Sequence, residues 1–223
     1  MKSKVISIEG VDGSGKNTQA NLLLEVLQAE NIPAVKYSFP CYEETFFGKE
    51  IGSYLRGEFG DLNAVHPKLA SMLFAGDRFE KKGEILSDLK MGKTIIMDRY
   101  VDSNLAHQCA KLGVEEHETF ISWAEELEYQ IYGLPRPDKT IFLDIPIEVS
   151  TKLVLLKKQR SYTQEQEDIH EKDHEYMRKV YSVYEYLSKR NSWELIECLD
   201  KGQIRSPGEI LNDIVSRILG PNK

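Results

Sequence analysis

At positions 10–16 the chain has the sequence Gly10-Val11-Asp12-Gly13-Ser14-Gly15-Lys16, the most informative segment for predicting the fold. A short apolar run at 5–8 precedes it, and an amphipathic helical pattern at 18–30 follows. The stretch matches the G-x-x-x-x-G-K phosphate-binding loop, in which glycines let backbone N–H groups converge on an anion. The following helix directs its positive N-terminal end to the same place. The predicted ATP-binding residues are Gly10, Val11, Asp12, Gly13, Ser14, Gly15, Lys16, Asn17 and Thr18.

Two residues at the end of this loop bear on catalysis. Lys16 is placed to neutralise β- and γ-phosphate oxygens while charge shifts during phosphoryl transfer. Asn17 stands where the motif has a Ser or Thr hydroxyl for Mg²⁺, and Thr18, one residue later, points in another direction. A glycine-rich turn that merely caps a helix is the competing interpretation. A phosphate loop alone does not separate a kinase from a GTPase or a motor ATPase.

Apolar runs and helical patterns alternate along the rest of the chain. Strand patterns lie at 5–8, 35–39, 94–98, 140–144 and 194–198, and helical patterns at 18–30, 68–90, 115–131, 149–158, 176–190 and 207–219. This alternation predicts an α/β fold, with a five-stranded parallel sheet covered by helices on both faces. We expect a single domain over 1–223, with a polar insert at about 157–173.

Composition excludes several classes of protein. The chain is 41% hydrophobic and 29% charged, which suits a globular domain, and its net charge of −7 argues against binding a nucleic-acid polymer. Three separated cysteines provide neither zinc spacing nor a disulfide framework. No signal-peptide pattern and no membrane-spanning apolar run is found, so we expect a cytoplasmic protein.

Four further motifs narrow the reaction: Phe39-Pro40, Phe74-Ala75-Gly76-Asp77-Arg78, Asp98-Arg99-Tyr100 and the run from Gly133 to Asp138. Phe74 and Arg78 share one helix face, where a ring can stack on a base and a guanidinium can donate to it. A core phenylalanine beside a surface arginine explains that pair equally simply. Asp98-Arg99 follows a buried strand at its carboxyl end, where open α/β sheets bind ligands, although a structural ion pair is the alternative.

In their order and spacing these motifs, together with the phosphate loop, resemble the thymidylate kinase family from about Val5 to Leu219. The resemblance implies a nucleoside-monophosphate kinase fold of the phosphate-loop class. It further implies ATP-dependent phosphorylation of dTMP to dTDP, with Mg²⁺ as cofactor and a homodimer as the assembly. Apolar faces around 69–73 and 120–127 are candidates for the dimer contact, or else belong to the core.

The resemblance also assigns roles to residues. It implies that Phe74 and Arg78 hold the thymine ring, that Arg99 clamps the acceptor phosphate, and that Asp98 organises Mg²⁺. Asp12 would accept the sugar 3′-hydroxyl, or else only stabilise the loop. If the run at 101–108 is helical, Asn104, His107 and Gln108 share a face, which the resemblance places beside the deoxyribose and base. The implied dTMP site comprises Asp12, Phe39, Tyr42, Phe74, Arg78, Arg99, Asn104, His107 and Gln108.

Three positions depart from the family pattern. Besides Asn17, Cys41 stands where many relatives have an arginine for the acceptor phosphate, and His107 stands where a tyrosine is common. These departures leave open a kinase for another pyrimidine nucleoside or deoxynucleoside monophosphate. A nucleotide-binding regulator without turnover is the alternative from another class of protein.

The polar insert is expected to form a short lid. The phosphate loop contains no arginine, whereas Lys157, Lys158 and Arg160 lie at the start of the insert. The chain therefore resembles the family members with a lid arginine, and Arg160 is the catalytic candidate, with ordinary solvated charge as the alternative. Residues 170–174 match the zinc-protease motif H-E-x-x-H, but their strongly polar flanks indicate a surface helix instead.

Overall fold

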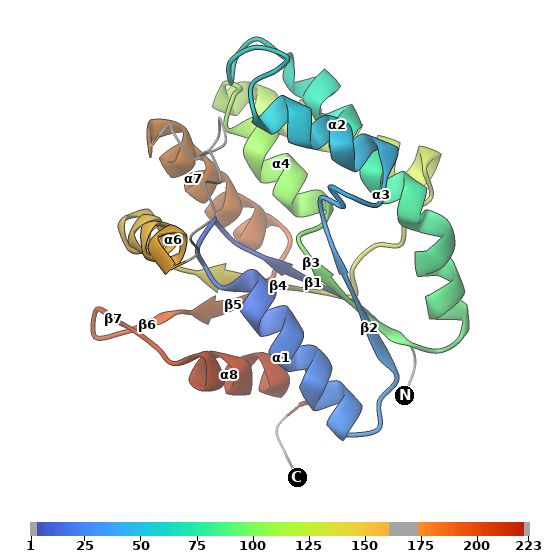
Figure 1. Ribbon diagram of the computed structural model, residues 1–223, viewed down its shortest axis with the longest axis vertical. Coiled ribbons are helices and arrows are strands. Elements are labelled where there is room, and N and C mark those ends of the chain that lie inside the picture. The colour runs from blue at the N-terminus through green and yellow to red at the C-terminus, as the bar shows by residue number, and fades with distance from the viewer. Residues whose placement is uncertain (1–3, 161–173, 221–223) are drawn as a thin grey trace.

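The computed structural model describes residues 4–160 and 174–220, with the side chains of 155–160 excepted. Its centre is a five-stranded parallel sheet with the strand order β2-β3-β1-β4-β5 (Figure 1). The strands are β1 Val5–Glu9, β2 Ala34–Ser38, β3 Thr94–Asp98, β4 Lys139–Asp144 and β5 Glu194–Glu197. The predicted five-stranded α/β fold is confirmed.

Helices cover both faces of the sheet (Figure 1). On one face α1 packs against β1, β2 and β3, and α8 packs against β5 and α1. On the other face α3 packs against β3, and α4 lies between α3 and α7. The helices are α1 Lys16–Ala29, α2 Phe46–Leu55, α3 Pro67–Lys90, α4 Val101–Cys109, α5 His117–Glu125, α6 Ile147–Arg160, α7 His174–Arg190 and α8 Pro207–Leu219.

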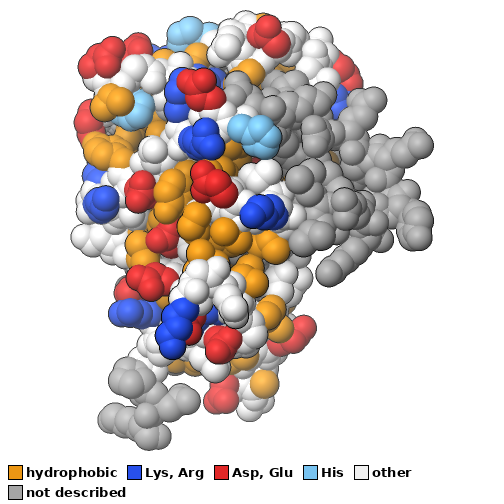
Figure 2. All heavy atoms as spheres, turned by 90° about the vertical axis from the view of Figure 1, so that its left-hand side faces the viewer, with side chains coloured by type: hydrophobic (Ala, Val, Ile, Leu, Met, Phe, Trp, Pro, Cys, Tyr) orange, Lys and Arg blue, Asp and Glu red, His pale blue; other side chains and the backbone are white. Residues whose placement is uncertain are grey.

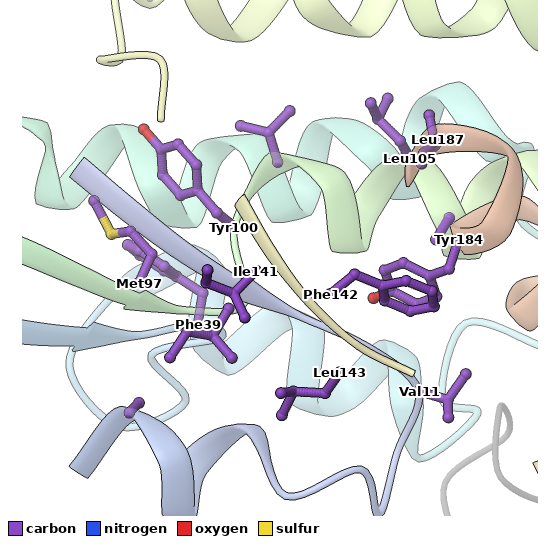
Figure 3. Close-up of a cluster of buried hydrophobic side chains, with 14 of the residues drawn as sticks. Val11, Phe39, Met97, Tyr100, Leu105, Ile141, Phe142, Leu143, Tyr184 and Leu187 are labelled. Atoms are coloured by element: carbon purple, nitrogen blue, oxygen red, sulfur yellow. The ribbon is translucent and has the colours of Figure 1, made fainter. Parts of the chain in front are cut away.

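The central strands are buried because helices cover them on both sides. Every residue of β1 and β3 is buried, as expected for a parallel sheet inside an α/β protein. On the α7 side Phe142 of β4 stacks on Tyr184 of α7, with ring centroids 5.7 Å apart and an interplanar angle of 16° (Figure 3). This packing fixes the strand ends from which the loops of the site emerge.

Several predicted boundaries were wrong. The single helix expected over 115–131 is a 3₁₀ turn (Val114–Glu116), then α5, then a π-helical segment (Glu126–Ile131). The wider π turn includes the fully buried Glu128, whose contacts in the interior outweigh the regular helical pattern. The helix expected to stop at 158 continues through Arg160.

Three elements were absent from the sequence prediction or were only conditional in it. Helix α2 was not predicted; its N-cap residue is Thr45, whose hydroxyl accepts a hydrogen bond from Gly48 N at 2.8 Å. Helix α4 was conditional, and all nine of its residues are buried, so it lacks the polar face of a surface helix. After β5 the chain forms a small antiparallel hairpin, β6 Leu199–Asp200 and β7 Gln203–Ile204.

The described surface mixes both signs of charge. On the face shown in Figure 2, Lys and Arg side chains are scattered among Asp and Glu side chains. Among the described residues, no helix is both long and apolar enough to cross a membrane.

Candidate active site

The phosphate loop joins β1 to α1 and depends on its glycines. Gly13 has φ of +81°, and a Cβ there would lie 2.5 Å from the Ser150 carbonyl oxygen of α6. Gly15 has φ of +91°, and nothing lies within 4 Å of the position a Cβ would take. Glycine is thus required at Gly13 by space and at both positions by backbone conformation. The loop leads directly into the N-terminus of α1, the end of a helix that attracts anions.

Lys16 lies folded over this loop. Its Nζ donates to the carbonyl oxygens of Gly10 and Val11, both at 2.8 Å, and the side chain is buried. Burial, reinforced by the nearby Arg99, lowers the pKa of Lys16 to about 8. A bound polyphosphate would stabilise the charged form, so the structure prepares this amine for an anionic ligand.

Asp98 and Arg99 lie at the carboxyl end of β3, next to the loop. The Asp98 carboxylate accepts a hydrogen bond from Asn17 Nδ2 at 2.9 Å. Arg99 has φ of +65°, an uncommon conformation for a residue with a side chain. Its guanidinium forms an ion pair with Asp12 of the loop. The two motifs predicted from separate parts of the sequence thus meet at one edge of the sheet.

A cavity of about 210 Å³ lies beside Arg99. Its lining combines aromatic side chains with amides and cations. All nine residues predicted for the dTMP site line it, together with Pro40, Leu55, Tyr100 and Ser103. Their binding role stays a prediction, but the structure brings them together, because α3 and α4 lie side by side above the strand ends.

Two amides of α4 line this cavity with unused hydrogen-bonding atoms. Gln108 is fully buried, and neither its Nε2 nor its Oε1 has a hydrogen-bond partner among the described residues. Oδ1 of Asn104 is likewise unpartnered in that part of the chain, while its Nδ2 donates to Ser71 Oγ at 2.8 Å. Buried polar atoms are almost always hydrogen-bonded, so these amides indicate a ligand with donor and acceptor groups.

Arg78 makes a contact that the sequence did not reveal. It is buried, and its Nε and Nη2 donate to the two carboxylate oxygens of Glu128 at 2.6 and 2.5 Å. Glu128 was not among the predicted site residues, since nothing in its neighbourhood marks it as more than part of a helix. A guanidinium held in this fork still lines the cavity, but its orientation is set by Glu128 rather than by a ligand.

Cys41 does not replace the arginine common at its position. Its thiol donates to the Ser38 carbonyl oxygen at 3.2 Å, and burial, then the nearby Asp77, raises its pKa to about 12. Asp77 accepts hydrogen bonds from Cys41 N at 3.0 Å and from Thr45 Oγ1 at 2.5 Å. Asp77 therefore holds this loop against α3, and Cys41 supplies no positive charge. Both arginines that line the cavity are thus ion-paired, Arg78 to Glu128 and Arg99 to Asp12.

His107 is neutral at physiological pH. Burial lowers its pKa to about 3. Tyr176 of α7 donates to the His107 carbonyl oxygen at 2.8 Å, and the same hydroxyl lies 3.2 Å from Nδ1 of the ring. This position thus contributes a neutral ring to the cavity wall, fixed from behind by α7.

The buried carboxyl of Glu9 is a second site feature that the sequence did not reveal. It accepts hydrogen bonds from Ser7 Oγ at 2.7 Å, Tyr100 N at 2.8 Å and Ser103 Oγ at 2.5 Å. Burial raises its pKa, and the hydrogen bonds from Ser103 and Ser7 oppose that rise. Because it bonds Tyr100 and Ser103, which follow Asp98-Arg99, Glu9 ties the end of β1 to the start of α4.

Two sequence predictions lie outside the described residues. Arg160 closes α6, but its side chain is not among the described ones, and neither is the insert that follows, so both remain predictions. Four of the five residues of the H-E-x-x-H match are likewise outside them. Among the described residues, no group of three or more His, Cys, Asp or Glu side chains is arranged to hold a metal ion.

Two features define the class of this protein. A phosphate loop follows the central strand of a parallel sheet, and a cavity lies beside that loop. This is the class of phosphate-loop proteins that bind a nucleotide next to a second ligand.

Comparison with known proteins gives the family. A family model described as "Thymidylate kinase" matches residues 8–200. The chain is similar to the thymidylate kinase of Plasmodium falciparum, with 29% identity over 97% of this chain and 90% of the relative. It is also similar to that of Mycobacterium tuberculosis, with 30% identity over 82% of this chain and 85% of the relative. A probable thymidylate kinase of Pyrococcus abyssi is 34% identical over 68% of this chain and 70% of the relative. The chain belongs to the thymidylate kinase family.

Proposed function

We infer that the protein transfers the γ-phosphate of ATP to dTMP, giving ADP and dTDP. Family membership supports this reaction. The observation that carries the choice of acceptor is the cavity beside the phosphate loop. There Phe74 offers a ring face, and Asn104 and Gln108 offer buried amide atoms without partners among the described residues. A pyrimidine base presents both a flat face and an edge of donors and acceptors, so it matches this lining.

Phosphoryl transfer brings two anionic groups together, the phosphates of ATP and the phosphate of the acceptor, and different residues would hold each of them. Lys16 and the backbone N–H groups of the loop would hold the phosphates of ATP. Arg99, whose guanidinium lies between the loop and the cavity, would orient the acceptor phosphate. The acceptor phosphate is already a nucleophile, so no general base is needed. Catalysis then comes from positioning two anions and stabilising the charge that shifts between them.

Mg²⁺ is the cofactor that this donor set fits. Asp98 supplies one buried carboxylate next to the phosphate loop. Mg²⁺ is commonly held by one or two carboxylates together with substrate phosphates and water, so it does not need a cluster of protein ligands. When bound, the ion would neutralise phosphate charge. We assign Asp98 as the residue that holds it, directly or through water.

We further propose a homodimer formed through α3. Leu69, Met72, Phe79 and Leu86 recur at helical spacing along this helix, with exposed fractions of 59%, 41%, 45% and 40%. A stripe of this kind can pair with the same stripe of a second copy about a two-fold axis. The other predicted face is part of the core, because Phe120, Ile121 and Ala124 are buried. We also propose that the chain forms a single domain and that the protein acts in the cytoplasm.

The direct test is ADP formation from ATP and Mg²⁺ in a coupled spectrophotometric assay, with dTMP, dUMP, UMP, CMP and AMP as separate acceptors. We expect turnover with dTMP to exceed turnover with every ribonucleotide. A Gln108→Leu variant should raise KM for dTMP more than KM for ATP, because it removes only cavity atoms. Preference for UMP or CMP would rule out the thymidylate assignment. Absence of all turnover despite ATP binding would support the regulator instead.

A further inference from the structure

Three hydrogen bonds connect a lysine of β2 to the carboxylate of Asp98. Lys36 Nζ donates to Asn21 Oδ1 at 2.6 Å. Asn21 Nδ2 donates to Asn17 Oδ1 at 3.2 Å, and Asn17 Nδ2 donates to Asp98 Oδ2 at 2.9 Å. Asn17 and Asn21 are one turn apart on α1, which packs against both β2 and β3.

The two ends of this chain determine its direction. A lysine ammonium can only donate hydrogen bonds, and an ionised carboxylate can only accept them. Lys36 therefore requires the oxygen of Asn21 to face it, which turns the Asn21 amide nitrogen toward Asn17. Asp98 requires the amide nitrogen of Asn17 to face it, which turns the Asn17 oxygen toward Asn21. The ammonium of Lys36 and the carboxylate of Asp98 thus determine which way the amides of Asn21 and Asn17 face.

This direction gives a role to the unusual residue at position 17. A Ser or Thr at this place in a phosphate loop offers an oxygen to Mg²⁺. In this chain the side chain presents its nitrogen to Asp98, and its oxygen is taken up by Asn21. A hydrogen-bond donor on one carboxylate oxygen holds the carboxylate in one orientation, as partners of metal ligands commonly do.

We propose that Asn17 is a positioning residue, which holds the Asp98 carboxylate through an amide orientation that Lys36 enforces by way of Asn21. The proposal deepens the proposed function, since it rests on Asp98 holding the divalent cation of the nucleotide. It assigns Asn17 as a donor to the metal-holding carboxylate rather than as a metal ligand itself. It also makes Lys36, a residue outside the phosphate loop, a determinant of metal affinity.

The test measures metal binding directly, with Mn²⁺ as the probe. Titrations of the ADP-bound protein are followed by the loss of the free Mn²⁺ signal in electron paramagnetic resonance. The variants are Asn17→Leu, which keeps the approximate size without a donor, Lys36→Met, which keeps the length without the charge, and the double variant. Lys49→Met, at an exposed lysine of α2 outside this chain of hydrogen bonds, is the matched control. Circular dichroism verifies that each variant is folded.

We expect Asn17→Leu to weaken Mn²⁺ binding by about tenfold, the lower end for loss of a partner of a metal ligand. Lys36→Met should weaken it by about two- to threefold, because a half-buried charge that acts through two amides contributes little. The double variant should match Asn17→Leu alone, since Lys36 acts only through the amide. In the coupled assay the metal activation constant should rise while KM for dTMP stays unchanged.

Three results would overturn the proposal. Unchanged Mn²⁺ affinity in folded Asn17→Leu would make Asn17 merely structural. Tighter binding in Lys36→Met would mean that the freed Asn17 oxygen ligates the metal. Additive effects in the double variant would separate Lys36 from Asn17. Because Mn²⁺ binding needs no acceptor, lack of turnover with dTMP would count against the proposed reaction without affecting this measurement.

Discussion

The ion pair between Arg78 and Glu128 changes the role inferred for Arg78. From the sequence, its four-residue spacing from Phe74 indicates a donor for the base. In the fold both residues line the cavity, but the guanidinium is bonded at two points to the buried Glu128. The pair serves stability and orientation together, because neither charge can stay buried alone without a large penalty.

Glu128→Gln should therefore be strongly destabilising. It keeps the size of the side chain but leaves the buried Arg78 without its counter-charge, which typically costs about 3–5 kcal/mol. Urea unfolding measures the loss, and KM for dTMP should rise because the guanidinium loses its fixed orientation. Glu118→Gln is the control, since its pair with Arg190 is exposed and should contribute at most about 1 kcal/mol. Equal urea midpoints for the two variants would contradict this account of the pair.

Lys16 should make ATP binding depend on pH. Its pKa of about 8 lies below that of an ordinary lysine, so the amine loses its proton as pH rises past that value. Bound phosphates favour the charged form, so binding at pH 9 should take up a proton, and ATP affinity should fall between pH 7 and 9. Calorimetry in buffers of different ionisation enthalpy measures the uptake. A Lys16→Met variant should show none, and equal uptake by both proteins would assign the proton elsewhere.

Among the secondary-structure elements, α4 matters most for the site. It is buried along its whole length between α3 and α7, so its polar residues face either the cavity or other buried groups. Ser103 bonds to Glu9, Asn104 bonds to Ser71, and Gln108 faces the cavity. A helix in this position needs polar partners from its neighbours, which explains why its sequence lacks an amphipathic pattern.

Helix α3 is the element on which assembly should depend. If its apolar stripe pairs with a second copy, Met72→Glu places two like charges near the two-fold axis and should convert the dimer to a monomer. Size-exclusion chromatography with light scattering gives the mass directly, and circular dichroism should show unchanged helix content. The control is Val114→Glu, which adds the same charge at an apolar side chain that is 80% exposed and away from α3. A monomeric unmodified protein would refute this dimer.

At the scale of the whole molecule, strand order creates the site. Because β1 lies between β3 and β4, the phosphate loop after β1 emerges beside Asp98-Arg99 at the end of β3. Helices α3 and α4 then enclose the acceptor cavity on the same side of the sheet. The phosphate loop and the cavity thus share one edge of the sheet, the carboxyl edge at which open parallel sheets bind ligands.

Binding at these two sites should stabilise the whole fold separately. A ligand present at 100 times its Kd adds about 2.7 kcal/mol to the free energy of unfolding. For a protein of this size that corresponds to a rise in Tm of about 5–10 °C. Differential scanning calorimetry should show this rise with dTMP, and a smaller one with UMP at the same concentration. Lys16→Met should keep the full dTMP shift and show a smaller ATP shift, whereas a reduction of both would mean that the two sites are not separate.

The five strands of the sheet and the phosphate loop could be predicted from local sequence alone. Alternating apolar runs and helical patterns identified all five strands, and the glycines of the phosphate loop act through backbone conformation within a few residues. Patterns of this kind depend only on residues close together in the sequence, so they can be recognised before the fold is known. The order of the motifs also led to the predicted dTMP site, whose nine residues all line one cavity, while their binding role stays a prediction.

Only the tertiary structure decided which groups are paired. Glu128 lies 50 positions from Arg78, and Asn17 lies 81 positions from Asp98, so no spacing in the sequence connects them. Glu9 resembles any residue at the end of a strand until the hydroxyl of Ser103 and the backbone of Tyr100 meet its carboxylate. The physical reason is desolvation: a buried polar group must find a partner in three dimensions, and that requirement sets orientation and charge without leaving a local pattern.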